Sequence, residues 1–355
     1  MRGYVRDDRA CGDGSFGGAR IANKISLTKL KKEIFERVIR MNISTQQLKT
    51  IYFGALEFAE TEDGYLQAFQ YTEPQIKYFE RVSEFWYDRC IASTAKTLEF
   101  MTSATAVSFE YKILWMGSED SVELYINGIF SKLVYVKDLK TEGKISFDLP
   151  EGEKQVMIYL PVDATMLIRN FTIDGDFTPP VKKEKVLWMG DSITQGYGPL
   201  RSSMTYVSIA NRTLQYDIIN QGIGGYVYDK NVLTDMNGYR PDKIIIAMGT
   251  NQFETESLVE VEEYYIALKE LYGDTPVLCI SPIWRGDKPG LEAIFERYCN
   301  GIKEICKKYD NITVVDGFEL VSHESAYFLD DLHPNVEGCE LYAKELVKAI
   351  KEVIF

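Results

Sequence analysis

The stretch VLWMGDSITQGYG, residues 186–198, constrains the fold of this chain more than any other. Its first four residues are apolar and the run stops at Gly190, which predicts a short buried strand. Asp191 and Ser192 follow directly. Because parallel α/β sheets bind ligands at the carboxyl ends of their strands, Ser192 is a candidate nucleophile. Ser and Asp after a strand also cap helices, so a capping role for these two residues stays open.

The composition narrows the class of protein. With 355 residues, 45% of them apolar, the chain is long enough for two domains that each bury a core. Its formal net charge of -13 disfavours nucleic acid as a partner, because binding to phosphates requires clustered Lys and Arg. The six cysteines form no Cys-x-x-Cys pair and are predicted to be free thiols. No stretch has the pattern of a signal peptide or a membrane span, so we expect a cytoplasmic protein without a membrane partner.

Residues 1–40 differ in character from the rest of the chain. Glycine and arginine are frequent at their start, and apolar residues recur at helical spacing between residues 27 and 38. We therefore predict a flexible or helical extension. Because this segment is basic and the remainder is acidic, Met41 is a candidate natural start, in which case the first forty residues would not belong to the native protein.

Short alternating segments fill residues 41–178. Apolar and polar residues alternate in 105–113 and again in 122–126, and the second run ends at Asn127-Gly128. This dipeptide between two strands favours a hairpin. Further strand-like runs follow at regular spacing, and we expect no long helix among them. The pattern predicts an all-β sandwich, similar to a jelly roll.

A charged connector with two prolines, residues 179–185, marks the predicted domain boundary. Beyond it, in residues 186–355, apolar runs of strand length alternate with segments of helix length. Such an alternation predicts an α/β domain, a doubly wound parallel sheet of five strands with helices on both faces. The predicted strands lie at residues 186–189, 218–219, 244–248, 277–280 and 312–315.

Polar residues of the kinds needed for acyl transfer stand in four of the strand-end loops. Each block alone has an ordinary explanation as a turn or a helix cap. Their joint placement matters more, because a doubly wound sheet brings its carboxyl-end loops to one crevice. The blocks are GDS at 190–192, NQGIGG at 220–225, GTN at 249–251 and DDLHP at 330–334.

These blocks contain the groups that a nucleophilic serine requires. A serine hydroxyl needs a base within hydrogen-bond reach, and the chain has only two histidines. His333 stands three residues after Asp330, so that the carboxylate can hold one ring nitrogen while the other faces Ser192. A tetrahedral intermediate needs donors for its oxyanion. The backbone N–H groups of Ser192 and Gly225 and the side-chain amide of Asn251 could supply them.

In this order, Gly-Asp-Ser-Ile-Thr, Asn-x-Gly-x-x-Gly, Gly-x-Asn and Asp-x-x-His resemble the four blocks of the SGNH, or GDSL-type, esterase superfamily. The resemblance covers about residues 185–355. It implies a flavodoxin-like sheet and a serine hydrolase without metal or cofactor, with the residues above in the family's roles. One position departs from the family, which often has Asp after the third-block Asn. Gln252 stands there instead, which puts the fixing of that loop in doubt.

A β-sandwich ahead of such a domain, together with GDSITxGYG, is similar to carbohydrate esterase family two. That resemblance implies a serine esterase that removes O-acetyl groups from sugars, with a small-molecule or oligosaccharide ester as substrate. Two alternatives remain. A lysophospholipase or acyl-thioesterase would use the same triad but would need an apolar acyl channel. A non-catalytic carbohydrate-binding protein would use the sandwich for recognition.

A few other residues are candidates for contact with a ligand. Trp284 and Arg285 follow the fourth predicted strand of the parallel sheet, where a sugar could stack or form hydrogen bonds, although Trp284 could equally cover the core. Trp86 and Trp115 are interpreted as core or edge aromatics of the sandwich. His323 is interpreted as a surface histidine without a catalytic role, because nothing near it supplies the rest of a triad.

Overall fold

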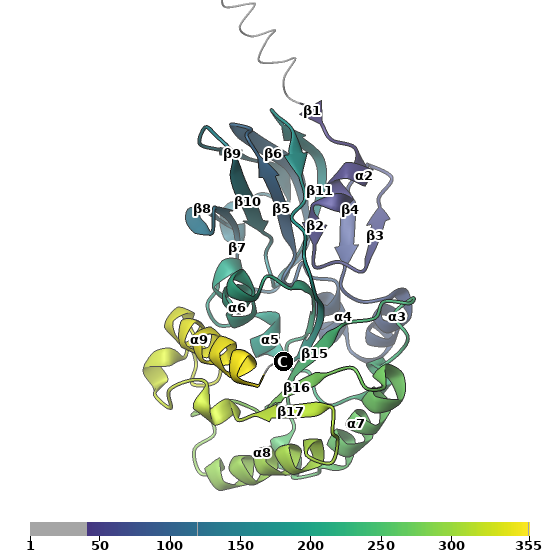
Figure 1. Cartoon of the computed structure of the whole chain (residues 1–355), viewed down its shortest axis with the longest axis vertical. Coiled ribbons are helices and arrows are strands. Elements are labelled where there is room, and N and C mark those ends of the chain that lie inside the picture. Colours follow the sequence, from purple (N-terminus) through teal and green to yellow (C-terminus); the bar gives the residue numbers. More distant parts are fainter. Residues whose placement is uncertain (1–40, 119, 354) are drawn as a thin grey trace, which may run out of the picture. The chain divides into compact units, whose positions relative to one another are not determined.

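Two antiparallel sheets pack face to face in the N-terminal half of the chain (Figure 1). The structure is a computed structural model that describes residues 41–118, 120–353 and 355. The extension predicted for residues 1–40 lies outside these residues. After β1 (Met41–Asn42), one sheet has the order β3 (Glu57–Glu60), β4 (Leu66–Phe69), β11 (Ala164–Ile173), β6 (Ala106–Met116), β9 (Glu142–Asp148). The other has the order β12 (Phe177–Thr178), β5 (Thr97–Thr102), β10 (Lys154–Tyr159), β7 (Ser121–Ile126), β8 (Ile129–Tyr135), and β2 (Tyr52–Phe53) pairs with β5.

Aromatic and branched residues from alternate positions of both sheets fill the space between them. The rings of Phe109 and Phe171 stack with centroids 6.2 Å apart, and Phe100 from the opposite sheet meets Phe171 edge-on at 5.9 Å. Asn127 and Gly128 join β7 to β8 with φ angles of 51° and 77°, which is the left-handed conformation of a tight hairpin turn. The predicted β-sandwich and its hairpin are therefore confirmed.

Three helices that the sequence interpretation did not place also lie in this half, before the first predicted strand. Among the described residues between 105 and 173 there is no α-helix, as predicted for the strand-like runs there. The start of α3 carries a clear local signal. The Thr72 N–H donates to Gln75 Oε1 at 3.0 Å, which caps the helix, and Pro74 occupies the first turn. The sequence interpretation was based on the alternating segments after residue 104 and did not use this signal. The helices are α2 (Thr45–Thr50), α3 (Glu73–Val82) and α4 (Glu84–Cys90).

The two tryptophans that were interpreted as sandwich aromatics have different positions. Trp115 lies on β6 and is half-buried, as expected for an edge aromatic. Trp86 lies on α4 and packs edge-on against Tyr226, which follows β14 (Asp217–Gly222) of the parallel sheet, with ring centroids 5.1 Å apart. The interpretation of Trp86 is therefore wrong, because α4 packs against the second half of the chain rather than into the sandwich.

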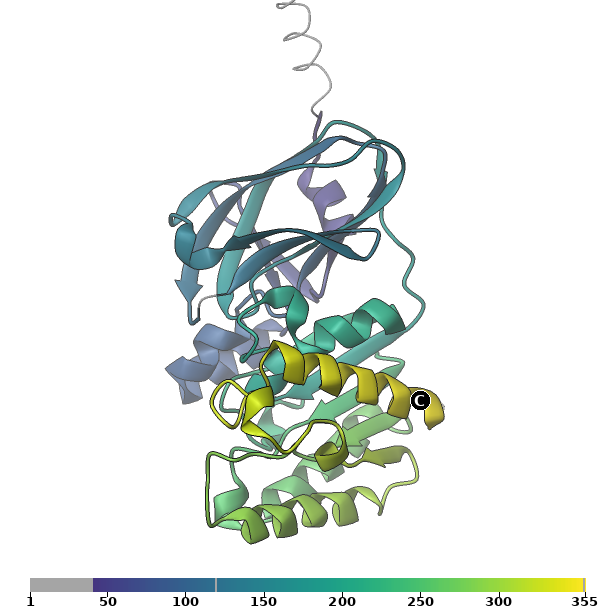
Figure 2. The ribbon, with the colours of Figure 1, turned by 90° about the vertical axis from the view of Figure 1, so that its left-hand side faces the viewer.

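The second half is built around a five-stranded parallel sheet, as predicted. Alternate residues of its central strand face opposite layers. Val186 and Trp188 pack with α6 and α9, whereas Leu187 and Met189 pack with α7 and α8 (Figures 1 and 2). The strand order is β14 (Asp217–Gly222), β13 (Lys185–Gly190), β15 (Lys243–Ala247), β16 (Val277–Ile280), β17 (Ile312–Val315), the order of flavodoxin-like sheets. The helices are α5 (Ser192–Gln195), α6 (Tyr206–Leu214), α7 (Val259–Tyr272), α8 (Glu292–Cys306) and α9 (Val336–Glu352). Short 3₁₀ helices lie in both halves. The N-terminal half has η1 (Val136–Asp138), and the second half has η2 (Ser202–Met204), η3 (Lys230–Val232), η4 (Phe253–Thr255), η5 (Gly317–Glu319) and η6 (Ser325–Tyr327).

Residues 42–355 form one compact unit, and the charged connector is part of it. Lys182 Nζ lies 2.7 Å from Glu99 Oε2, and both side chains are only 4% exposed. This buried ion pair fastens the connector to β5. Over the part of the chain that the structure describes, no helix has both the length and the apolar character needed to cross a membrane. The cysteines in that part are free and buried, as predicted, namely Cys90, Cys279, Cys299, Cys306 and Cys339; Cys11 lies outside it.

One lysine is fully buried in the N-terminal half with neutral partners. Lys96 Nζ donates to the carbonyl of Ala92 at 2.6 Å and to the side-chain oxygen of Gln70. Removing an ammonium group from water disfavours its charged form. Burial accordingly lowers the pKa of Lys96 to about 7.

This lysine makes the stability of the fold depend on pH. Between pH 7 and the usual lysine pKa of about 10.4, the unfolded chain binds the proton and the folded chain does not. The free energy of unfolding should therefore rise with pH across this window, by at most about 1.4 kcal/mol per pH unit, and fall as pH drops toward 7. Urea denaturation at pH 7, 8 and 9 should show this slope in the wild type and a smaller slope in Lys96→Met. Lys77→Met, which changes an exposed lysine, is the control; equal slopes in all three proteins would contradict the assignment.

Candidate active site

The end of β13 presents Ser192 through a very short helix. The Asp191 side chain accepts a hydrogen bond from the Ile193 N–H at 3.1 Å and so caps α5, which begins at Ser192. The helix ends after one turn at Gly196, whose φ of 115° favours glycine. Burial raises the pKa of the Asp191 carboxyl to about 7, against the opposing effect of its backbone hydrogen bonds. Asp191 is therefore the capping residue of this stretch, and the Ser192 side chain is free for other contacts.

A histidine and a carboxylate are aligned behind the Ser192 hydroxyl. Ser192 Oγ lies 2.8 Å from His333 Nε2, and His333 Nδ1 lies 2.8 Å from Asp330 Oδ2. The backbone N–H of His333 also donates to Asp330 Oδ1 at 2.8 Å. Burial of the Asp330 carboxyl acts to raise its pKa, but these hydrogen bonds outweigh it and hold the pKa below its usual range. The carboxylate is thus kept ionised next to the imidazole.

The remaining side of His333 is covered by an aromatic ring. Tyr197 meets the imidazole edge-on, with ring centroids 4.7 Å apart, and its N–H donates to the Ser192 carbonyl at 2.9 Å. Gly198 allows the chain to pass close to Pro334 here, since its φ is 128° and a Cβ would collide with the Pro334 carbonyl. The sequence interpretation did not single out Tyr197, although it stands within the GDSITQGYG motif.

The predicted oxyanion donors lie on two neighbouring loops that are tied together. Asn251 Nδ2 donates to the carbonyl of Tyr226 at 2.9 Å, which leaves its second amide hydrogen available. Gly225 adopts a φ of 70°. Gln252, the departure from the family pattern, accepts a hydrogen bond from the Tyr228 N–H at 2.6 Å. This contact fixes the third-block loop to the second-block loop.

Ser192, His333, Gly225 and Asn251 all line one cleft of about 350 Å³. Both halves of the chain form its walls. The N-terminal half contributes residues that sequence reasoning missed, on α4 and on two loops between strands of the sandwich. The further lining residues are Phe85, Arg89, Gly117, Asp163, Gln195, Tyr197, Gly224 and Leu332.

The wall from the N-terminal half combines an aromatic ring with an ion pair. Phe85 is 51% exposed, and the guanidinium of Arg89 lies 3.6 Å from the centre of its ring. Arg89 Nε lies 3.8 Å from Asp163 Oδ1, and the two side chains are 16% and 4% exposed. Burial raises the pKa of Asp163, with the charge of Arg89 acting in the opposite direction. On this wall of the cleft, the positive charge of Arg89 and the negative charge of Asp163 therefore largely cancel each other.

The structure does not bring the two residues proposed for substrate contact into this cleft. Arg285 is buried, where it pairs with Asp287 at 2.6 Å and donates to the Thr250 carbonyl at 2.5 Å. Trp284 stacks on His323 with centroids 5.9 Å apart. Both line a separate hollow near Phe253. A position just after a strand does not specify direction, and here the buried salt bridge turns the Arg285 side chain away from Ser192.

His323, the second histidine of the chain, is exposed. Its Nε2 lies 2.8 Å from the carbonyl of Phe318, and it is not among the residues that line the cleft. This placement agrees with its interpretation as a surface histidine.

A parallel sheet in this strand order, with the four loop blocks at its carboxyl edge, defines an SGNH hydrolase fold. Residues 188–341 match the GDSL-like Lipase/Acylhydrolase family. This part of the chain is therefore a GDSL-like lipase/acylhydrolase domain, which supports a hydrolase that acts on esters. A comparison with curated proteins gives no match.

Solved structures resemble both halves together. The salicylyl-acyltransferase SsfX3 from a tetracycline biosynthetic pathway aligns with a TM-score of 0.66, over 85% of this chain and 94% of its own. A family two carbohydrate esterase from Cellvibrio japonicus aligns with a TM-score of 0.60 over the same shares. The acetyl xylan esterase Est2A from Butyrivibrio proteoclasticus aligns with a TM-score of 0.56 over 73% and 90%. At 17% identity in each case, the likeness shows a shared two-part fold.

Proposed function

We propose that this protein is a serine esterase that removes O-acetyl groups from carbohydrates. The observation that carries the proposal is the alignment of Ser192, His333 and Asp330, with 2.8 Å from Ser192 Oγ to His333 Nε2 and 2.8 Å from His333 Nδ1 to Asp330 Oδ2. This is the arrangement in which imidazole activates a hydroxyl and a carboxylate orients the imidazole. The aligned set argues for catalysis rather than for binding alone.

In the proposed reaction, Ser192 Oγ attacks the ester carbonyl carbon while His333 Nε2 accepts the hydroxyl proton. Asp330 holds the Nδ1–H and stabilises the imidazolium that forms. The N–H groups of Ser192 and Gly225 and the amide of Asn251 donate to the oxyanion. His333 then returns the proton to the leaving alcohol oxygen, which leaves an acyl group on Ser192. Water attacks this ester by the same route and releases acetate and free Ser192.

The cleft walls support a polar alcohol with a small acyl group. A long acyl chain would need an apolar channel, whereas Arg89 and Asp163 place an ion pair in the cleft wall that the N-terminal half forms. A compensated ion pair suits neutral hydroxyl groups, which both donate and accept hydrogen bonds, better than an anion. Two of the structural relatives are a family two carbohydrate esterase and an acetyl xylan esterase. These observations favour sugar acetates over lipids.

Acetate release from acetylated xylan, acetylated mannan and small acetylated sugars tests this proposal, with p-nitrophenyl acetate and octanoate as reporters of acyl length. We expect sugar acetates to be cleaved, and kcat/KM for the acetyl reporter to exceed that for the octanoyl reporter at least about 10-fold. A preference for octanoyl esters or lysophospholipids would instead indicate a lipid hydrolase. Binding of these glycans without acetate release would indicate a carbohydrate-binding protein.

A further inference from the structure

Gln195 connects the N-terminal half of the chain to the predicted oxyanion loop. It is the last residue of α5 and is only 2% exposed. Its Nε2 donates to Asp163 Oδ1 at 2.9 Å, and its Oε1 accepts from the Gly224 N–H at 2.7 Å. Both ends of the amide are therefore engaged. Since the carboxylate accepts and the backbone N–H donates, the orientation of the amide is determined by its two partners.

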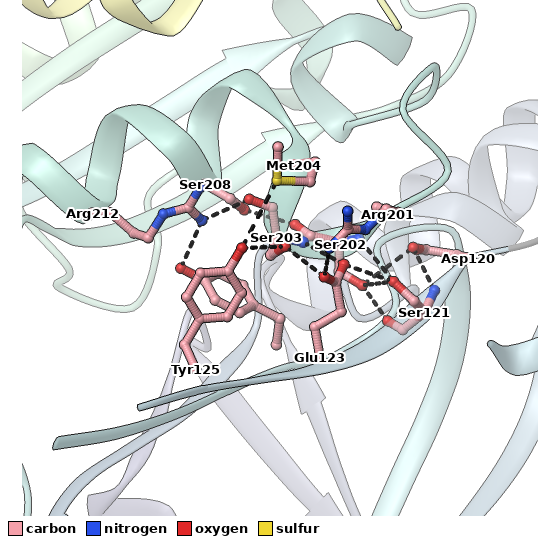
Figure 3. Close-up of polar contacts among 11 residues, drawn as sticks. Asp120, Ser121, Glu123, Tyr125, Arg201, Ser202, Ser203, Met204, Ser208 and Arg212 are labelled. Carbon is pink, nitrogen blue, oxygen red and sulfur yellow. Dashed lines mark hydrogen bonds and ion pairs between the residues drawn. The ribbon is translucent and has the colours of Figure 1, made fainter. Parts of the chain in front are cut away.

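Asp163 is itself held in place from the sandwich. Its backbone N–H donates to Asp120 Oδ2 at 3.1 Å, and its carbonyl accepts from the Gly117 N–H at 2.8 Å. Asp120 is buried and also accepts from the Ser202 hydroxyl at 3.2 Å, and Ser202 follows α5 in the second half of the chain. Figure 3 shows the contacts of Asp120 with Ser121 and Ser202. The anchor of Gln195 is thus a rigid position on the sandwich rather than a mobile surface carboxylate.

The loop at the other end of Gln195 needs such support. Gly224 and Gly225 are consecutive glycines, which have the largest conformational freedom of any residues, and Gly225 must keep a φ of 70° to present its N–H. The Gly224 N–H has its hydrogen bond with Gln195, and the Arg89 side chain closes the space above Gly224, where a Cβ would lie 3.0 Å from Arg89 Cδ. Asp163, Gln195 and Gly224 therefore form a continuous support that ends one residue before the donor.

We propose that Gln195 and Asp163 are positioning residues that hold the Gly224–Gly225 turn so that the Gly225 N–H reaches the oxyanion. This inference rests on the proposed esterase function. The sandwich half thereby completes the oxyanion hole instead of only recognising substrate. Because a donor acts on the charge that develops in the transition state, loss of the support lowers kcat and leaves KM nearly unchanged.

The test uses the full chain, with p-nitrophenyl acetate as substrate so that sugar recognition plays no part. In Gln195→Met, which keeps the side-chain length but removes both hydrogen bonds, kcat should fall about 10- to 100-fold, as expected for a displaced catalytic group. KM should change less than about two-fold. Gln75→Met is the matched control, since this buried glutamine donates to the Val232 carbonyl at 3.0 Å and does not line the cleft. It should lose a similar amount of stability and retain kcat.

An exchange of donor and acceptor separates positioning from a general loss of stability. Gln195→Glu keeps an acceptor for the Gly224 N–H but sets two carboxylates against each other at Asp163, so kcat should fall. Adding Asp163→Asn restores a donor, because its amide N–H can now donate to the carboxylate of Gln195→Glu, while the total charge stays that of the wild type. The double variant should recover at least about half of the lost activity, measured as the logarithm of kcat.

Three outcomes would contradict the inference. They are an unchanged kcat in Gln195→Met, a rise of KM with kcat retained, which would indicate substrate contact, and failure of the double variant to recover although it folds by circular dichroism. Failure of the proposed function looks different, since Ser192→Ala would then cleave p-nitrophenyl acetate as fast as the wild type. If Ser192→Ala is inactive and Gln195→Met is fully active, only the positioning role is wrong.

Discussion

Ser192→Ala is expected to lower kcat for p-nitrophenyl acetate by at least about 10⁴-fold, because removal of the nucleophile of a serine triad leaves only binding and oxyanion stabilisation. The fold should be little affected. The Ser192 hydroxyl contacts His333 at 2.8 Å, and alanine is well tolerated at the start of a helix such as α5. Stopped-flow and steady-state assays, with urea denaturation alongside, measure both quantities. We expect the free energy of unfolding to stay within about 1 kcal/mol of the wild type.

Ser208→Ala is the matched control for this experiment. Ser208 is buried on α6, and its hydroxyl donates to the Ser202 carbonyl at 2.9 Å, outside the cleft. It should keep full activity. An organophosphate that forms a covalent adduct with activated serines should label the wild type and Ser208→Ala at Ser192, as read by peptide mass spectrometry. Labelling at another serine, or turnover by Ser192→Ala near the wild-type rate, would refute the proposed nucleophile.

Asn251→Ala carries the second largest expected effect, a fall in kcat of about 10²- to 10³-fold with KM nearly unchanged. Its amide has one hydrogen committed to the Tyr226 carbonyl at 2.9 Å, and the second hydrogen is the one we expect to bind the oxyanion. Asn251→Asp preserves the shape but replaces the donor with an acceptor, so it should lose at least as much activity. Steady-state kinetics with p-nitrophenyl acetate measures both variants.

Asn211→Ala tests whether the fall in kcat of Asn251→Ala results only from the lost hydrogen bond to a backbone carbonyl. Its Nδ2 donates to the Tyr216 carbonyl at 3.1 Å, a bond of the same kind that lies outside the cleft. This control should lose stability but not kcat. An Asn251→Ala variant with only the stability loss of the control, and with kcat retained, would remove Asn251 from the oxyanion hole.

The strands of the second half of the chain could be predicted from its sequence. Apolar runs of strand length were found at the strands that the structure contains, because a parallel sheet that is covered on both faces requires continuous apolar strands. The joint position of Ser192 and His333 at one edge then follows from topology alone, since the carboxyl ends of parallel strands share an edge. Asp330 was predictable for a local reason, its separation of three residues from His333.

For Trp284 and Arg285, the position along the chain was predicted correctly, but the direction in which the side chains point was not. Trp284 and Arg285 do follow β16, but the pairing of Arg285 with Asp287 and Thr250 points them into a separate hollow. No local pattern indicates which way such a side chain turns. The missed helix α3 is a different case. Its capping residues Thr72 and Gln75 are a local signal that the sequence interpretation did not use.

By itself, the sequence determined the sandwich, the parallel sheet and the residues that meet at its carboxyl edge, because strand periodicity and topology leave few alternatives. Only the tertiary structure decided that Phe85, Arg89 and Asp163 form a wall of the same cleft. These residues lie about 30 to 110 positions before Ser192, and their place depends on how side chains from two halves pack and pair. Contacts of this kind depend on the fit between side chains and on the pairing of buried charges. Neither produces a periodic pattern in the sequence.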